Sequence, residues 1–167
     1  MKKLFDKGVE GFSLYRVIGQ NIFFIVYFTI GAIGLWPIQM YGTPLISIAY
    51  ILFLIVMILF VLRKHLCTKC YYYGKLCSTG WGKLSAWIFE KNSGNYRFGV
   101  KLATVTWTLA MLIPITGMVL IMVVDFSYSV MIILAVFIVL TFLNFFTHRD
   151  ACKKCKMKFI CPASISK

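Results

Sequence analysis

Four long stretches of this chain contain no charged residue, and they restrict the folds that it can adopt. Each is about 17 to 23 residues long, enough for a helix rising about 1.5 Å per residue to cross a hydrocarbon layer of about 30 Å. The chain is 60% hydrophobic and only 14% charged, which is too apolar for a soluble domain. The sequence therefore predicts an all-α, integral membrane four-helix bundle with spans at residues 18–40, 44–62, 102–124 and 129–146.

The spans divide the chain into five segments. Short turns within 18–62 and 102–147 predict two antiparallel transmembrane hairpins, separated by a loop at 63–101 and followed by a tail at 148–167. Residues 1–17 are interpreted as an amphipathic interfacial helix, because Leu4, Phe5, Val9, Phe12 and Tyr15 share one face. A second surface helix is expected in the loop, where apolar residues recur at helical spacing: Trp81, Leu84, Trp87 and Ile88.

The positive charges predict the orientation in the membrane. All 18 Lys and Arg residues lie in segments 1–17, 63–101 and 148–167, and neither turn on the opposite side contains one. Lys and Arg near span ends are retained in the cytoplasm, so we expect a multi-pass plasma-membrane protein with both termini cytoplasmic. The net charge of +13 is interpreted as contact with anionic lipid headgroups rather than with nucleic acid. Docking of an acidic protein or an anionic ligand is the alternative.

All six cysteines lie in two matching motifs on the predicted cytoplasmic side. Each half of the chain ends its hairpin with basic residues and one histidine, followed by C-x2-C and, after six or five intervening residues, a third cysteine. Two similar halves with the same orientation predict a parallel repeat about an axis along the membrane normal, which would bring the motifs together. The motif residues are His65, Cys67, Cys70 and Cys77 in the first half, and His148, Cys152, Cys155 and Cys161 in the second.

Cysteines in a reducing cytoplasm indicate metal or redox chemistry rather than structural disulfides. Thiolates suit an iron–sulfur cluster, our first choice, or zinc, and metal-free thiols with a redox-active disulfide remain a third option. Nearby lysines are expected to lower the thiol pKa values: Lys69, Lys75, Lys153, Lys154, Lys156 and Lys158. Pro162 after Cys161 is similar to the Cys-Pro ending of ferredoxin cluster motifs.

Six cysteines are too few for two sites of four cysteines each. One arrangement shares Cys67, Cys70, Cys152 and Cys155 in a single site and leaves Cys77 and Cys161 as a pair. The other gives each half a three-cysteine site that is completed by His65 or His148, by a partner, or by an open position. All six cysteines are therefore candidate cofactor ligands, and the two histidines are candidate metal ligands.

The sequence contains little that points to an autonomous enzyme. It has no P-loop, G-x-S-x-G or H-E-x-x-H motif. No ionisable residue lies in the middle of a span, which disfavours a pump or coupled transporter.

Over segments 67–77 and 152–162 and in its four-helix layout, the chain resembles small cysteine-motif membrane proteins of strict anaerobes, methanogenic archaea especially. The resemblance implies an accessory subunit of a large membrane complex, such as the sodium-pumping methyltransferase of methanogenesis, and transfers no functional residue. We expect a subunit whose metal–thiolate module senses redox state or oxygen and docks on an acidic cytoplasmic partner. An electron-transfer component carrying an iron–sulfur cluster and a zinc-tied scaffold are the alternatives.

Overall fold

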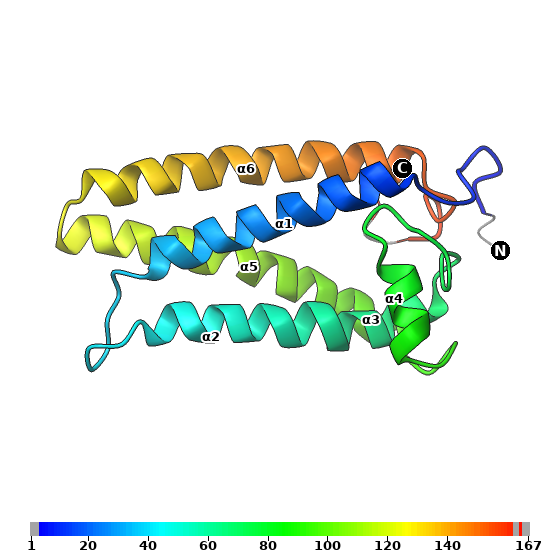
Figure 1. Ribbon diagram of the computed structural model, residues 1–167, viewed down its shortest axis with the longest axis horizontal. Helices are drawn as coiled ribbons and strands as arrows, with labels where there is room; N and C mark the ends of the chain where they lie inside the picture. Colours follow the sequence, from blue (N-terminus) through cyan, green and yellow to red (C-terminus); the bar gives the residue numbers. More distant parts are fainter. Residues whose placement is uncertain (1–3, 162–163, 165–167) are drawn as a thin grey trace.

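The computed structural model describes residues 4–161 and 164, and within them the chain is all-helical (Figure 1). Four helices are long and apolar enough to cross a membrane, which confirms the predicted fold class at that level. They are α1 (Leu14–Leu35), the continuous run Leu45–Lys69, α5 (Tyr96–Val124) and α6 (Tyr128–Lys153). Four residues used in the sequence predictions lie outside the described part: Lys2, Lys3, Pro162 and Lys167.

The second spanning run changes its helical type along its length. It consists of α2 (Leu45–Leu54), the π-helix η1 (Ile55–Val61), α3 (Leu62–His65) and the 3-10 turn η2 (Cys67–Lys69). The run therefore continues past the end of the apolar stretch at residue 62 and carries the first cysteine pair on its last turns. A short helix, α4 (Trp81–Ile88), follows in the loop, where the spacing of apolar residues predicted a helix. Its placement at a membrane interface stays a prediction.

Helix α1 packs against α2, α5 and α6, and small residues let it approach them closely. A Cβ atom added to Gly31 would lie 3.1 Å from the Phe137 ring and 3.2 Å from both Pro114 and the Tyr50 hydroxyl. Two clusters of buried side chains form on either side of α1. One contains Leu35, Tyr50, Leu54, Ile58 and Ala110, and the other contains Tyr27, Met118, Val130 and Phe137.

A proline inside α5 creates a polar contact between two spans. Pro114 has no N–H, so the carbonyl of Ala110, four residues earlier, lacks its helical partner. The hydroxyl of Tyr50 donates to that carbonyl at 2.8 Å. A backbone group freed within a bilayer needs such a replacement because no water is present to supply one. The bond therefore joins α2 to α5 at the point where the helix would otherwise be weakest.

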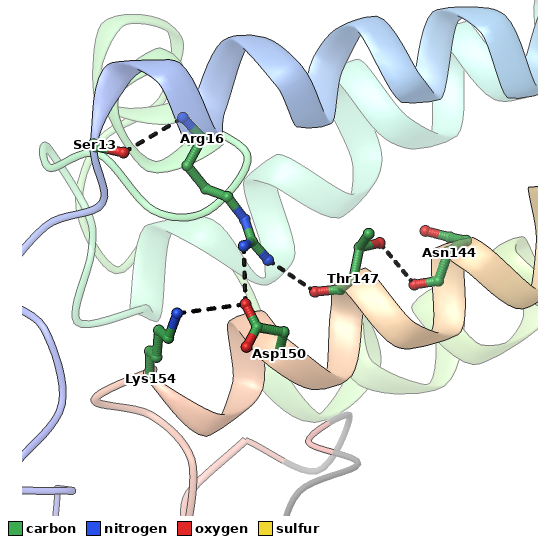
Figure 2. A network of polar contacts seen from close by, with 6 residues as sticks. All are labelled: Ser13, Arg16, Asn144, Thr147, Asp150 and Lys154. Atoms are coloured by element: carbon green, nitrogen blue, oxygen red, sulfur yellow. Dashed lines mark hydrogen bonds and ion pairs between the residues drawn. The ribbon is translucent and has the colours of Figure 1, made fainter.

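Both cysteine motifs and residues 4–13 lie at one end of the bundle (Figure 1). We call this the cysteine end: residues 4–17, 62–101 and 147–161. There the Arg16 guanidinium on α1 donates to Asp150 Oδ2 at 2.9 Å and to the Thr147 carbonyl at 3.0 Å, as Figure 2 shows. Lys154 Nζ lies 3.6 Å from the same carboxylate. These contacts fix the start of α1 against the end of α6.

The predicted surface helix over residues 1–17 is wrong for the described residues before α1. Residues 4–13 form turns and an isolated bridge between Val9 and Cys155. Two of the apolar side chains that suggested an amphipathic helix, Phe5 and Phe12, pack instead on the cysteine motifs. Phe5 meets Phe159 edge to face at 5.5 Å between ring centroids, and Phe12 lies 5.8 Å from Tyr72. Periodicity alone did not distinguish a lipid-facing surface from one that packs on a distant part of the chain.

Candidate functional site: the two cysteine motifs

The first motif begins where the second span ends. The 3-10 turn places the Cys70 N–H on the carbonyl of Cys67 at 3.2 Å, and the buried Thr68 hydroxyl donates to Lys64 O at 2.6 Å. Beyond Cys70 the chain folds back over α4, because the Gly74 N–H donates to Gly82 O at 3.0 Å. This local structure directs the segment from Cys70 to Cys77 across the cysteine end.

The second motif repeats this local geometry at the end of α6. The Cys155 N–H donates to the carbonyl of Cys152 at 3.2 Å, as in the first motif, and the Cys161 N–H donates to Met157 O at 2.7 Å. Cys152 lies in the last turn of α6 and is buried. In each motif a spanning helix therefore carries the first cysteine, and a turn immediately after it positions the second.

Tyr72 joins three segments that are distant in the sequence. Its hydroxyl donates to Val9 O at 2.7 Å and accepts from the Lys156 N–H at 3.1 Å, and its side chain is 1% exposed. Backbone bonds continue the contact: Phe5 N–H to Lys156 O and Val9 N–H to Lys154 O, each at 2.9 Å. The tail that carries Cys155 is thus held between the N-terminal segment and the first motif. No pattern in the sequence pointed to this role of Tyr72.

The structure brings cysteines of both motifs near one another. A negative charge on Cys77, Cys155 or Cys161 raises the pKa of Cys70, so all three lie within the electrostatic range of that thiol. Cys155 responds in the same way to Cys161 and Cys152. Cys77 also lies near Thr79, with 3.3 Å between its sulfur and the hydroxyl. Cys70 therefore lies within electrostatic range of the second motif, as Tyr72 lies in direct contact with it.

The expected lowering of thiol pKa values is wrong for Cys70 and Cys155. Burial raises the pKa of Cys70 to about 12, which the backbone N–H of Tyr72 only partly offsets. Burial likewise raises the pKa of Cys155. Four of the six lysines expected to act on the thiols bind other groups, and removal of a thiolate from water outweighs the rest. Lys75 and Lys156 bind Glu10, Lys154 binds Asp150, and Lys158 lies over the rings of Phe5 and Phe159.

Each candidate histidine has a neighbour of its own. His65 Nδ1 accepts the Asn95 N–H at 3.0 Å, and its ring lies edge to face on Phe98 at the start of α5. His148 Nε2 lies 3.5 Å from the Cys152 sulfur, one helical turn away. All six cysteines are described, and none is in a disulfide. Within the described residues, no three His, Cys, Asp or Glu side chains are already placed to hold a metal ion.

Glu10 forms an ionic contact that holds the N-terminal segment on both motifs, and nothing in the sequence pattern singled it out. Its carboxylate accepts from Lys156 Nζ at 2.6 Å and from the Tyr71 hydroxyl, and it lies 3.6 Å from Lys75 Nζ. The hydrogen bond from Lys156 is the main reason that its pKa falls from 4.5 to about 2. The carboxylate therefore holds the N-terminal segment on both motifs only while it is ionised.

This lowered pKa predicts an acid-sensitive contact. A carboxylate whose pKa is lower in the folded chain stabilises the fold above its unfolded pKa of 4.5, and that stabilisation is lost as the pH falls toward about 2. We expect hydrogen exchange in residues 5–12 to accelerate over this interval while exchange in the α5 core stays unchanged. The Glu10→Gln variant should exchange quickly at pH 6 and show no further step. An identical pH profile in both proteins would contradict this role of Glu10.

The chemistry of the cysteine end follows from these positions. Buried thiols near one another repel as thiolates, and a bound cation or cluster removes that repulsion. Candidates for this role come from both motifs, because Cys70 lies within electrostatic range of Cys155 and Cys161. The chain matches no protein-family model, no curated protein and no solved structure.

Proposed function

We propose that this chain is a membrane-anchored accessory subunit whose cysteine end binds one metal–thiolate centre shared between its two motifs. The observation that carries the proposal is the 3.1 Å hydrogen bond from the Lys156 N–H to the Tyr72 hydroxyl, which holds the segment after Cys70 against the residue that follows Cys155. Cys70 also lies within electrostatic range of Cys155 and Cys161. In this proposal those three sulfurs are ligands, and Cys67 or Cys77 supplies the fourth. An iron–sulfur cluster is the first choice and zinc the second, since both bind four thiolates.

The proposed topology is two hairpins related as a parallel repeat, with the cysteine end in the cytoplasm. The matching turns at Cys67–Cys70 and Cys152–Cys155 support the repeat. The positive-inside rule supports the orientation, because the basic residues cluster at this end. Eleven of the described ones are exposed there: Lys7, Lys64, Lys69, Lys75, Lys83, Lys91, Arg97, Lys101, Arg149, Lys153 and Lys154.

This basic surface is the proposed docking site for an acidic face of a larger membrane complex. Charges exposed on a rim accelerate association and select partners of opposite sign. The metal centre lies among the segments that form the surface, since Tyr72 connects the N-terminal segment to both motifs. Oxidation or loss of the centre would release those segments and change the docking surface. This coupling is the proposed basis of redox or oxygen sensing.

Two single substitutions distinguish a shared centre from two separate ones. We expect Cys70→Ser and Cys155→Ser, each alone, to remove nearly all bound metal from protein purified without air. Two independent sites would instead lose about half of the metal in each variant. Iron, zinc and acid-labile sulfide are measured per chain, and Ser93→Ala, an exposed position in the same loop, is the control. Full metal content in both cysteine variants would contradict the proposal.

A zinc-tied scaffold is a second candidate, favoured by the backbone bonds that hold residues 5–9 on residues 154–156. A scaffold of this kind needs only a structural zinc ion in addition to these backbone bonds. Zinc without sulfide, and unchanged docking after oxidation, would support this candidate. Iron with sulfide, together with an optical change on reduction and turnover toward an acceptor, would support an electron-transfer component instead.

A further inference from the structure

An apolar groove lies between α1 and the second spanning run, and no cysteine lines it. It has a volume of about 580 Å³ and extends from Trp36 and Ser47 at one end to Asn21 and Arg63 at the cysteine end. Buried side chains such as Ala32 and Ile58 form its floor. Its rim consists of exposed apolar residues, including Ile25, Ile33, Ile51 and Ile55. In a bilayer such a groove opens toward lipid chains rather than toward water.

A buried positive charge closes the inner end of this groove. Arg63 is 2% exposed, its Nε donates to Ile58 O at 3.2 Å, and its guanidinium lies 4.8 Å from the centre of the Trp81 ring. Its Nη1 is buried and has no hydrogen-bond partner among the described residues. No carboxylate of the described chain forms an ion pair with it. A buried donor on a charged group is costly without a partner, so an anionic acceptor would be stabilised here.

A second cavity continues from the same arginine toward the loop. It has a volume of about 420 Å³ and shares Asn21, Arg63 and Trp81 with the groove. Lys83 adds a second cation at its wall. The two cavities together are apolar along the spans and cationic at the cysteine end. This polarity matches a molecule with one long apolar chain and an anionic head.

The helix type along the groove independently indicates that the groove is a functional site. Ile55, Ile58 and Leu59 lie on the π-helix and line the groove. π-Helical turns are uncommon and are frequent at functional sites. The Arg63 Nε–H bonds to the carbonyl of Ile58, five residues earlier, so the π-helix and the placement of the charge belong to one arrangement. We therefore treat the groove and the arginine as a single site.

We propose that this site binds one anionic membrane phospholipid, with an acyl chain in the groove and its phosphate between Arg63 Nη1 and Lys83. A phosphate oxygen satisfies the buried donor and neutralises the charge, and charge-assisted bonds of this kind are among the strongest in proteins. A zwitterionic lipid would bring its own cation to the same place and leave the positive charge there uncompensated. A quinone would offer only a neutral carbonyl, which does not neutralise Arg63.

The test uses the full chain, extracted in mild detergent and placed in nanodiscs of equimolar phosphatidylglycerol and phosphatidylcholine. Native mass spectrometry after ejection from the nanodisc measures the lipid that stays bound. We expect one phosphatidylglycerol per chain, and about tenfold weaker retention in Arg63→Gln, since a charge-assisted bond is lost. Equal retention of both lipids, displacement by a short-chain quinone, or unchanged retention in Arg63→Gln would overturn the proposal.

A second variant keeps the test decisive if Arg63→Gln does not fold, because Arg63 also contacts Ile58 and Trp81. Ile51→Trp places a larger side chain at the rim of the groove without touching the arginine. We expect it to reduce lipid retention at least as strongly as the charge substitution. Ile132→Trp, at an exposed position of α6 that does not line the groove, is the matched control and should retain the lipid. Equal retention in both tryptophan variants would exclude the groove as the acyl site.

Discussion

Replacing Phe137 by Ala is expected to lower the free energy of unfolding by about 2 to 3 kcal/mol, mostly from the cavity that it leaves. Phe137 is 0% exposed and stacks on Tyr27 with 4.6 Å between ring centroids. It also lies against Gly31 of α1, so it fills the contact between α1 and α6. In a bilayer the transfer term largely disappears, because lipid chains are as apolar as the protein interior. The remaining cost is lost packing.

The matched control is Phe142→Ala on the same helix, where the side chain is 61% exposed. The same atoms are deleted there, but lipid replaces the lost contacts, and we expect a change below about 0.5 kcal/mol. Both variants would be unfolded by a denaturing detergent in mixed micelles, with helical content as the readout. Equal destabilisation of the two would mean that α6 does not present Phe137 to the bundle interior.

Gly82→Ala is expected to disturb the cysteine end strongly, by pushing the first motif away from α4. An added Cβ would lie 2.0 Å from the Tyr72 carbonyl oxygen and 2.8 Å from that of Lys75. Both are backbone atoms in the turn between Cys70 and Cys77, so no side-chain rotation relieves the overlap. Overpacking of this kind costs about 1–3 kcal/mol. We expect a lower thermal midpoint, faster maleimide labelling of Cys70 and Cys77, and reduced metal content.

The control for this substitution is Gly19→Ala in α1, where an added Cβ meets nothing within 4 Å. Alanine favours a helix over glycine by about 0.5–1 kcal/mol, so the control should be neutral or slightly stabilised. Labelling rates are measured by mass spectrometry on each cysteine-containing peptide. Slow labelling in Gly82→Ala, equal to that in the control, would show that the motif does not rest on α4.

The spanning helices were predictable because a charge-free stretch of sufficient length has few alternatives. Their ends were not. The second span continues to Lys69 rather than ending at residue 62, since Arg63 is buried by Trp81 instead of facing water. The prediction of a surface helix at residues 4–13 failed for a related reason. An apolar stripe indicates that a face is covered, but not whether lipid or a distant segment covers it.

The cysteine end shows the same limit of prediction from the sequence. The motifs and their spacing identify the sulfurs as candidate ligands, and that assignment stays a prediction. The contacts through Tyr72 and Glu10 join residues far apart in the sequence, and no local pattern reports them. The thiol pKa prediction was wrong because it counted nearby lysines in the sequence. In the fold four of those six lysines bind carboxylates or lie over aromatic rings, while burial acts on the sulfurs.

The sequence by itself determined the number of spans, the all-helical class and the gathering of basic residues and cysteines in the same segments. These properties depend on composition and on local periodicity, which are written in consecutive residues. Only the tertiary structure decided that Cys70 lies near the second motif, and that Arg63 is buried at the end of an apolar groove. Both depend on which helices pack together, because burial and the distance between remote charges are properties of the packed chain.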